Sequence, residues 1–125
     1  MSEISKKVLV VDDEEAICRA LQLFLEQKGF EVALAHTGMA ALSHVATTLP
    51  DLILLDVMMP GMDGLQVLQR LKEDERTKSI PVVILSAAAE LQDLQKGWDK
   101  GTDVYLTKPI QMDQLASMVE CILNP

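Results

Sequence analysis

Short apolar runs alternate with longer segments of helical period along the chain, and this alternation is the feature that most constrains the fold. We interpret five runs as strands, at residues 7–11, 30–35, 51–56, 81–86 and 103–108. Alternating strands and helices form a parallel sheet with right-handed crossovers and helices on both faces. The sequence therefore predicts a doubly wound α/β fold with a five-stranded parallel sheet.

The segments that follow the strands carry apolar residues on one helical face. The expected faces, in chain order, are Ile17, Ala20, Leu21 and Phe24; Leu42, Val45, Ala46 and Leu49; Leu65, Leu68 and Leu71; Leu91, Leu94 and Trp98; and Leu115, Val119 and Ile122. Gly29, Pro50 and Gly101 mark helix ends, because glycine and proline commonly terminate helices. The fourth face is the thinnest, so we expect that helix to be the least firmly packed.

Length and charge exclude several classes of protein. A chain of 125 residues suits a single domain, and we expect one domain over residues 1–125. The net charge of -8 argues against direct binding to nucleic acid, because phosphate contacts need clustered Lys and Arg. The longest apolar runs fall far short of the roughly 20 residues that cross a bilayer, and the polar start is not a signal peptide. We therefore expect a cytoplasmic protein without a direct membrane contact.

The cysteines and histidines lack the spacing of a metal or redox motif. Cys18 and Cys121 fall in helical patterns, and we expect both thiols to be buried. His36 and His44 are expected to have surface or packing roles.

Four of the five predicted strands end with a residue that can bind a cation or a phosphate group. These residues are Asp12 and Asp13, Asp56, Ser86 and Lys108. The second strand ends at Ala35 and His36, outside this set. In a doubly wound sheet the ligand crevice lies beyond the carboxyl ends of the strands, so we expect the set to face one crevice.

Helix capping is a simpler explanation for some of these residues, since acidic side chains suit the positive end of a following helix. Capping could explain Asp12, Asp13 or Ser86 singly. It does not explain Asp56, which ends a leucine-rich run and precedes more apolar side chains. We therefore favour a shared site.

The residue types of the set favour phosphoryl chemistry. Three carboxylates in one crevice need a cation, because otherwise the pKa of one of them would rise strongly. Oxygen ligands favour a hard ion such as Mg²⁺. A metal ion, the Lys108 ammonium and a hydroxyl around one carboxylate suit a phosphoryl group. Asp56 then has the position of a nucleophile that forms an aspartyl phosphate.

At these residues the chain resembles the receiver domain of two-component response regulators. The matching segments are "VLVVDDEE", "PDLILLDVMMPGMDGLQVLQRLK", "IPVVILSA" and "GTDVYLTKP", in family order across almost the entire chain. The stretch "LLDVMMPGMDG" is highly specific for that family. The resemblance implies a flavodoxin-like sheet with strand order 2-1-3-4-5. It also implies a phosphorylation-dependent switch, which would receive its phosphoryl group from a sensor histidine kinase or a phosphotransfer protein.

The resemblance assigns roles to single residues. Asp56 would accept the phosphoryl group, and Asp12 and Asp13 would hold Mg²⁺ together with Asp56 and the main-chain carbonyl of Met58. Such a domain catalyses only its own phosphorylation and slow dephosphorylation, so it is a switch more than an enzyme.

Further roles follow from the same resemblance. Ser86 and Lys108 would contact the phosphoryl group, and Tyr105 would be the aromatic switch residue of the fifth strand. The bond before Pro109 would be cis, which is accessible at low cost only before proline. The face formed by the fourth helix, the fifth strand and the fifth helix would contact an output domain or protein, or a second copy of the chain.

The chain departs from the commonest family pattern at four positions. Ser86 replaces a more frequent threonine, and Ile110 occupies a position that is often aromatic. Met58 and Ala88 are apolar where an attacking water must be oriented. Because neither can hold that water well, we expect the phosphorylated protein to hydrolyse slowly.

Two other functions are compatible with parts of this pattern. A phosphatase of the haloacid dehalogenase type also uses an aspartyl phosphate, but it needs a second aspartate where this chain has Met58. A binding module that is never phosphorylated would not need the complete set of site residues. We expect either a stand-alone receiver or a receiver with an output domain beyond residue 125.

Overall fold

The computed structural model describes residues 5–57, 64–87 and 104–124, and in this part of the chain five parallel strands form one sheet. The strands are β1 (Lys7–Val11), β2 (Glu31–Ala35), β3 (Leu52–Asp56), β4 (Val82–Ala87) and β5 (Val104–Lys108). Their order is β2-β1-β3-β4-β5, so the predicted doubly wound, flavodoxin-like sheet is confirmed.

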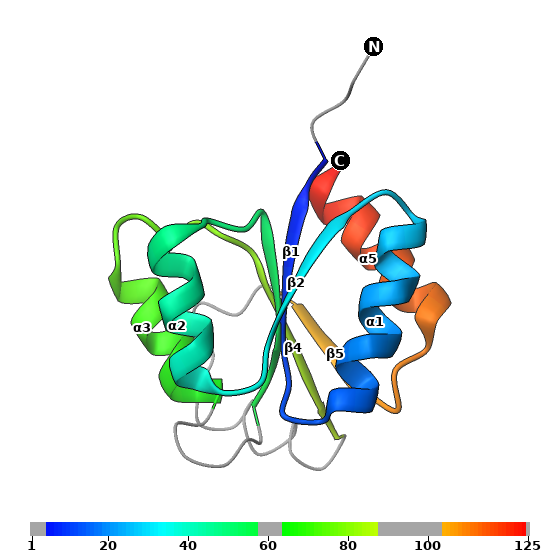
Figure 1. The fold of residues 1–125 in the computed structure, drawn as a ribbon, viewed down its shortest axis with the longest axis horizontal. Coiled ribbons are helices and arrows are strands. Elements are labelled where there is room, and N and C mark those ends of the chain that lie inside the picture. Colours follow the sequence, from blue (N-terminus) through cyan, green and yellow to red (C-terminus); the bar gives the residue numbers. More distant parts are fainter. Residues whose placement is uncertain (1–4, 58–63, 88–103, 125) are drawn as a thin grey trace.

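Helices cover both faces of the sheet, as the strand–helix alternation predicted (Figure 1). The described helices are α1 (Glu15–Gln27), α2 (Gly38–Thr47), α3 (Gly64–Glu73) and α5 (Met112–Leu123). The helices α1 and α5 lie on one face, and α2 and α3 lie on the other. The helix expected around residues 91–98 falls outside the described residues. In the described part of the chain, each helix is too short or too polar to cross a bilayer.

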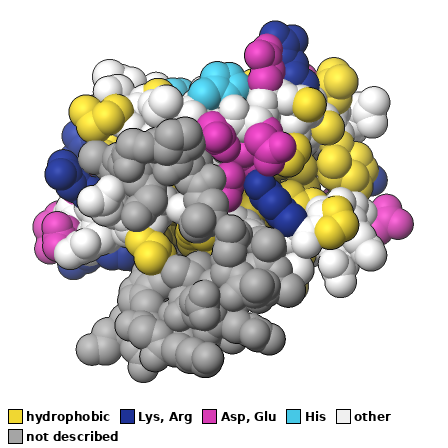
Figure 2. All heavy atoms as spheres, turned by 90° about the horizontal axis from the view of Figure 1, so that it is seen from below, with side chains coloured by type: hydrophobic (Ala, Val, Ile, Leu, Met, Phe, Trp, Pro, Cys, Tyr) yellow, Lys and Arg dark blue, Asp and Glu magenta, His cyan; other side chains and the backbone are white. Residues whose placement is uncertain are grey.

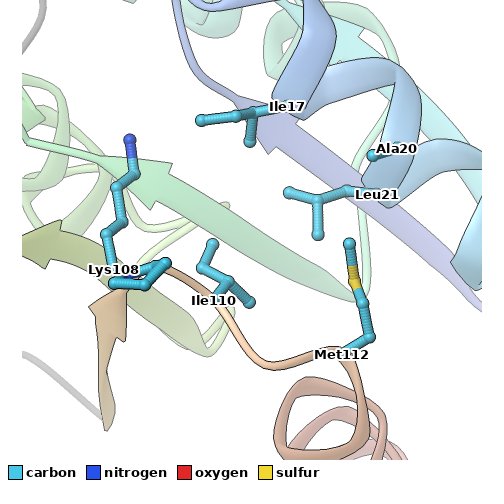
Figure 3. Close-up of a pocket in the computed structure, with 7 residues that line it drawn as sticks. Ile17, Ala20, Leu21, Lys108, Ile110 and Met112 are labelled. Atoms are coloured by element: carbon cyan, nitrogen blue, oxygen red, sulfur yellow. The ribbon is translucent and has the colours of Figure 1, made fainter.

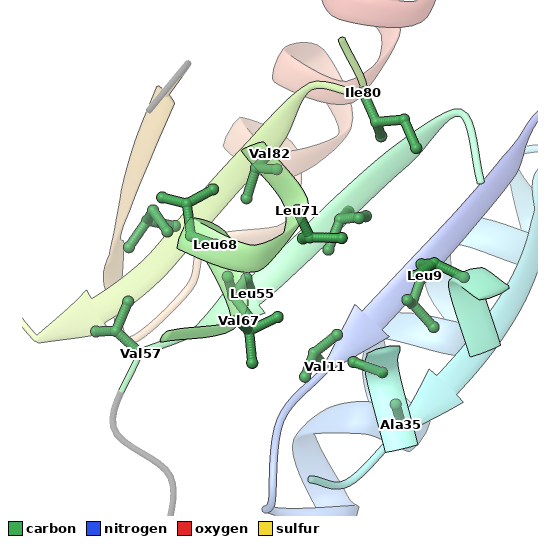
Figure 4. Close-up of a cluster of buried hydrophobic side chains, with 14 residues drawn as sticks. Leu9, Val11, Ala35, Leu55, Val57, Val67, Leu68, Leu71, Ile80 and Val82 are labelled. Carbon is green, nitrogen blue, oxygen red and sulfur yellow. The ribbon is translucent and has the colours of Figure 1, made fainter. Parts of the chain in front are cut away.

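Two hydrophobic clusters hold these layers together, because successive side chains of a strand point to opposite faces. Leu9 and Val11 of β1 pack toward α2 and α3, in the cluster drawn in Figure 4. Val8 and Val10 pack toward α1 and α5. Every residue of β3 is buried, as expected for a central parallel strand with helices on both sides.

The end of α1 shows how a local signal determines a boundary. Gly29 has φ of 97°, a conformation that costs residues other than glycine free energy. Its N–H group donates to the carbonyl of Glu26, and the next N–H group, that of Phe30, donates to the carbonyl of Leu25. These bonds close the helix where the sequence predicted its end.

Three packing predictions were wrong. Ala20 is exposed on α1, and Ala46 is exposed on α2. Leu49 is also exposed, because α2 ends at Thr47 and the extended backbone of Thr48 carries the chain away from the helical face. The prediction for the thiols was half right, because Cys18 is buried and Cys121 is exposed on α5.

Candidate functional site

Three carboxylates converge at the carboxyl ends of β1 and β3. Val11 pairs with Leu55 in the sheet, so the next residues along the two strands, Asp12 and Asp56, are neighbours. Oxygen atoms of Asp12, Asp13 and Asp56 all lie within 4.8 Å of one another. Figure 2 shows acidic side chains gathered on this face with a basic side chain beside them.

Lys108 reaches this cluster from the end of β5. Its Nζ atom lies 3.1 Å from Asp12 Oδ2, 3.4 Å from Asp56 Oδ2 and 3.5 Å from Glu14 Oε1. Burial by itself would lower the pKa of the ammonium, but the hydrogen bond and charge of Asp12 and then the charge of Asp56 outweigh it, and the pKa is raised. Lys108 therefore stays charged at neutral pH.

The charge of the cluster suits a divalent cation. Asp12 and Asp56 are buried, whereas Asp13 is exposed to solvent. Asp12, Asp13 and Asp56 carry more negative charge than one ammonium offsets, and Glu14 adds to this excess, so the cluster attracts a divalent cation. The donor atoms are carboxylate oxygens, which hard ions such as Mg²⁺ prefer. The residues present therefore fit the predicted magnesium ion.

An apolar pocket of about 420 Å³ lies beside Lys108, between α1 and the segment that leads into α5 (Figure 3). Ile17 and Leu21 of α1 line it, together with Ile110 and Met112 from the other side. Lys108 borders this pocket with its hydrocarbon stem, while its ammonium reaches the carboxylates.

Gly64 brings the start of α3 against the end of β3. Its N–H group donates to the carbonyl of Val57 at 3.1 Å. A Cβ atom at this position would lie against Val57 Cα and 2.5 Å from the main-chain oxygen of Asp56. Only glycine permits this approach, so Gly64 helps to determine the position of Asp56.

The remaining predicted residues lie on β4, on β5 or just after β5. Ser86 is buried one residue beyond Leu85, which pairs with Asp56. Tyr105 pairs with Ile84 and is partly buried against the cluster on the α2 and α3 face. The peptide bond between Lys108 and Pro109 is cis, as the resemblance implied. Met58 and Ala88 lie outside the described residues.

Three residues at this site were missed by the sequence analysis. Glu14 pairs with Lys108, and the run of four acidic residues at 12–15 was the only local signal for it. Cys18 and His36 both approach the main-chain oxygen of Asp12. The end of β2 therefore does contribute to the site, contrary to our prediction.

Cys18 is a buried thiol rather than a reactive one. Burial, followed by the negative charge of Asp12, raises the pKa of this thiol to about 11. The thiol is therefore protonated at neutral pH and can donate a hydrogen bond.

The sequence profile of the response regulator receiver domain matches residues 8–120. The chain belongs to this family. Among curated proteins, it is 40% identical over 118 residues to the DNA-binding dual master transcriptional regulator RpaA of Synechocystis sp., covering 94% of this chain and 49% of that protein. It is 44% identical over 119 residues to the response regulator PleD of Caulobacter vibrioides, covering 95% of this chain and 26% of PleD. The receiver thus spans about half of RpaA and about a quarter of PleD.

A solved structure supports the same assignment. The receiver domain of the Francisella response regulator 1452 superposes with a TM-score of 0.85 at 34% identity, covering 95% of this chain and 97% of that one. The family and the acidic cluster together make this a receiver of two-component signalling, whose general function is phosphorylation-dependent switching.

Proposed function

We propose that this receiver takes a phosphoryl group on Asp56 from a sensor histidine kinase or a phosphotransfer protein, in the presence of Mg²⁺. The observation that carries the proposal is the position of Lys108, whose ammonium lies within 3.5 Å of both Asp12 and Asp56. Asp56 is the member of the cluster at the end of the central, fully buried strand.

The transfer is a displacement at phosphorus. A carboxylate oxygen of Asp56 attacks, the bond between phosphorus and the donor histidine breaks, and that imidazole leaves with the bonding electron pair. Lys108 is already beside Asp56 and neutralises charge on the phosphoryl oxygens. Asp12, Asp13, Asp56 and the Met58 carbonyl would hold Mg²⁺, which adds further charge neutralisation when bound.

The signal would leave the site through Ser86 and Tyr105. Ser86 lies on β4, the strand that pairs with the Asp56 strand, and Tyr105 lies on β5, one strand further. A phosphoryl group adds about -1.5 to -2 charges at Asp56, beside the end of β4. We expect the Ser86 hydroxyl to be drawn toward these charges and Tyr105 to follow. The surface of β5 and α5, with the helix expected around residues 91–98, would then contact the output partner or form a homodimer.

The proposed partners are proteins rather than nucleic acid. The chain carries a net charge of -8, and RpaA, which spans twice its length, is named as DNA-binding. We propose that any DNA contact belongs to an output domain or protein that this receiver controls. Its place in the cytoplasm, beside a kinase, is part of the same proposal.

Labelling with acetyl phosphate tests the central step. We expect mass spectrometry to find one phosphoryl group, on Asp56, and to find none in Asp56→Asn. Asp113→Asn is the matched control, because Asp113 lies in the first turn of α5 and is not one of the three clustered carboxylates. Full labelling of the Asp56→Asn variant would reject the assignment.

Beryllofluoride tests the output step, since it mimics the phosphoryl group on a carboxylate. We expect amide NMR shifts to change at Tyr105 and along the exposed side of α5. The Ser86→Ala variant should still bind beryllofluoride but show a smaller change at Tyr105. Unchanged shifts on this face in the wild type would contradict the proposed output surface.

A further inference from the structure

The main chain of Asp12 is held on both sides of its Cα atom. Its N–H group donates to the carbonyl of Ala35 at 3.1 Å, which extends the ladder between β1 and β2 by one bond. Its carbonyl oxygen lies 3.1 Å from Sγ of Cys18 and 3.2 Å from Nδ1 of His36. Side chains from α1 and from the end of β2 thus meet at one main-chain oxygen.

Both side chains donate to this oxygen. A carbonyl oxygen can only accept, so the contact requires the His36 ring to carry a proton on Nδ1. The Cys18 thiol is the other donor, from Sγ to the same oxygen. The two donors are themselves neighbours, with 3.7 Å between Sγ and Nδ1.

We propose that Cys18 and His36 are positioning residues that fix the peptide group between Asp12 and Asp13, and so hold both carboxylates in place for a divalent cation. We call this pair of donors the carbonyl clamp. The proposal rests on the proposed function, because it concerns the same metal site.

The peptide plane carries the effect of the carbonyl clamp to Asp13. A peptide group is planar, so fixing the Asp12 carbonyl also fixes the nitrogen of Asp13 and the direction in which the chain leaves β1. Asp13 is the exposed carboxylate of the three, so its main chain decides its position more than side-chain packing does. A ligand held in place before binding loses less conformational freedom, and metal affinity rises.

Asp12 is positioned by the same bonds. With its N–H group and its carbonyl both bonded, the backbone angles on each side of its Cα atom are restrained. Its carboxylate then accepts from the Glu14 N–H group and from Lys108. Loss of the carbonyl clamp leaves the bond to Ala35 in place, so metal binding should weaken before the sheet does.

Calorimetric titration of Mg²⁺ into variants of the full chain tests this role. Cys18→Ala and His36→Ala each remove one donor, and we expect each to raise the magnesium dissociation constant about threefold to tenfold. Cys18→Ser and His36→Asn each retain a donor at the same place, and both should stay within about twofold of the wild type. His36 is exposed, so its substitution leaves the core intact.

Two controls separate positioning from packing. Val119→Ala removes buried volume from the cluster that contains Cys18, without touching the carbonyl clamp. It should lower the free energy of unfolding and leave magnesium affinity unchanged. Cys121→Ala removes the exposed thiol of α5 and should change neither quantity.

The amide ¹⁵N shift of Asp13 provides a direct signature, because that nitrogen shares its peptide group with the Asp12 carbonyl. It should move in Cys18→Ala and His36→Ala but not in Val119→Ala. Magnesium affinities in the two alanine variants equal to that of the wild type would overturn the proposal, as would serine and asparagine variants that bind as weakly as the alanine variants. If the wild type does not bind magnesium, or if Asp13→Asn binds it as tightly as the wild type does, the proposed function fails instead.

Discussion

The two ends of the sheet both carry charged side chains, but their partners differ. At the amino end, Asp51 accepts from the N–H group of Lys7 at 2.7 Å, and Lys72 donates to the carbonyls of Lys78 and Ile80. Lys78 and Glu75 form an exposed ion pair at the same end. At the carboxyl end, the Lys108 ammonium and the carboxylates face one another.

This difference distinguishes charged side chains that stabilise the fold from charged side chains that form the candidate site. A side chain that satisfies a main-chain group removes a cost of folding, and the pair is then complete. Carboxylates that face one another repel, and one lysine does not neutralise them. The carboxyl end therefore keeps a repulsion between carboxylates that a bound cation can relieve, and this lowers the stability of the ion-free protein.

Glycine substitutions give the largest expected contrast between the two ends. Gly64→Ala places a methyl group against Val57 and the main chain of Asp56, and we expect it to lower the free energy of unfolding by about 2–3 kcal/mol and to reduce labelling of Asp56. Gly29→Ala, at the amino end of β2, meets no neighbour within 4 Å and should cost about 1–2 kcal/mol through its positive φ alone. Urea unfolding and acetyl phosphate labelling measure both effects. Reduced labelling of Asp56 in Gly29→Ala would contradict the view that only the carboxyl end of the sheet affects phosphoryl transfer.

Buried hydroxyls give the next contrast. Thr77, between α3 and β4 at the amino end, donates to the carbonyl of Leu71 at 2.6 Å. Thr77→Val should lower the free energy of unfolding by about 1–2 kcal/mol and leave the labelling rate unchanged, because the hydroxyl bonds the main-chain carbonyls of Leu71 and Asp74 rather than a group of the site. Ser86→Ala at the carboxyl end should instead slow labelling. Equal labelling rates in these two variants would show that the hydroxyl at the carboxyl end has no role in phosphoryl transfer.

The lifetime of the phosphoryl group should depend on the carboxyl end alone. Met58 and Ala88 follow β3 and β4 in the sequence and offer poor hydrogen-bond partners to an attacking water. We expect Met58→Asn combined with Ala88→Glu to speed dephosphorylation about tenfold, since a well-placed hydrogen bond worth about 1.4 kcal/mol has this effect on a rate. Ala46→Glu with Leu49→Asn is the matched control, because both residues are exposed near the amino end. A double variant at the carboxyl end that is no faster than wild type would reject water orientation as the cause.

The smallest expected effect is a gain in stability. Asp13→Asn removes one negative charge from the cluster, and without a divalent ion we expect the free energy of unfolding to rise by about 0.5–1 kcal/mol. Excess Mg²⁺ should reverse the order of the two proteins, because the ion stabilises the wild type more. Asp51→Asn, at the amino end, should destabilise the protein in both conditions. Thermal unfolding with a chelator and with Mg²⁺ compares the stability of all three proteins. If Asp13→Asn is less stable than the wild type in chelator, the carboxylates of the cluster do not destabilise the ion-free protein by repulsion.

Local pattern was enough to predict much of the fold. The predicted strands agree with the observed ones to within one residue at each end, because each strand is a short apolar run. The errors at Leu49 and Cys121 arose because residues of these types were assumed to be buried. Whether such a side chain is buried depends on where the helix ends and on which side it faces.

The residue types at the predicted strand ends were also enough to predict the charged part of the candidate site. Parallel strands place their carboxyl ends on one edge, so Asp12, Asp56 and Lys108 could be grouped before any distance was known. The contacts of Cys18 and His36 could not be predicted in this way. A cysteine in a helix and a histidine after a strand carry no pattern that points to a particular carbonyl.

The sequence by itself determined the order of strands and helices, the parallel sheet and the residue types at its carboxyl edge, because these depend on local periodicity and chain direction. Only the tertiary structure decided which groups meet. Lys108 and Asp12 are 96 residues apart in the chain, and the register of the sheet brings them to 3.1 Å. The packing of α1 beside β2 likewise brings Cys18 and His36 to the Asp12 carbonyl, because such distances depend on how layers dock rather than on any neighbour in sequence.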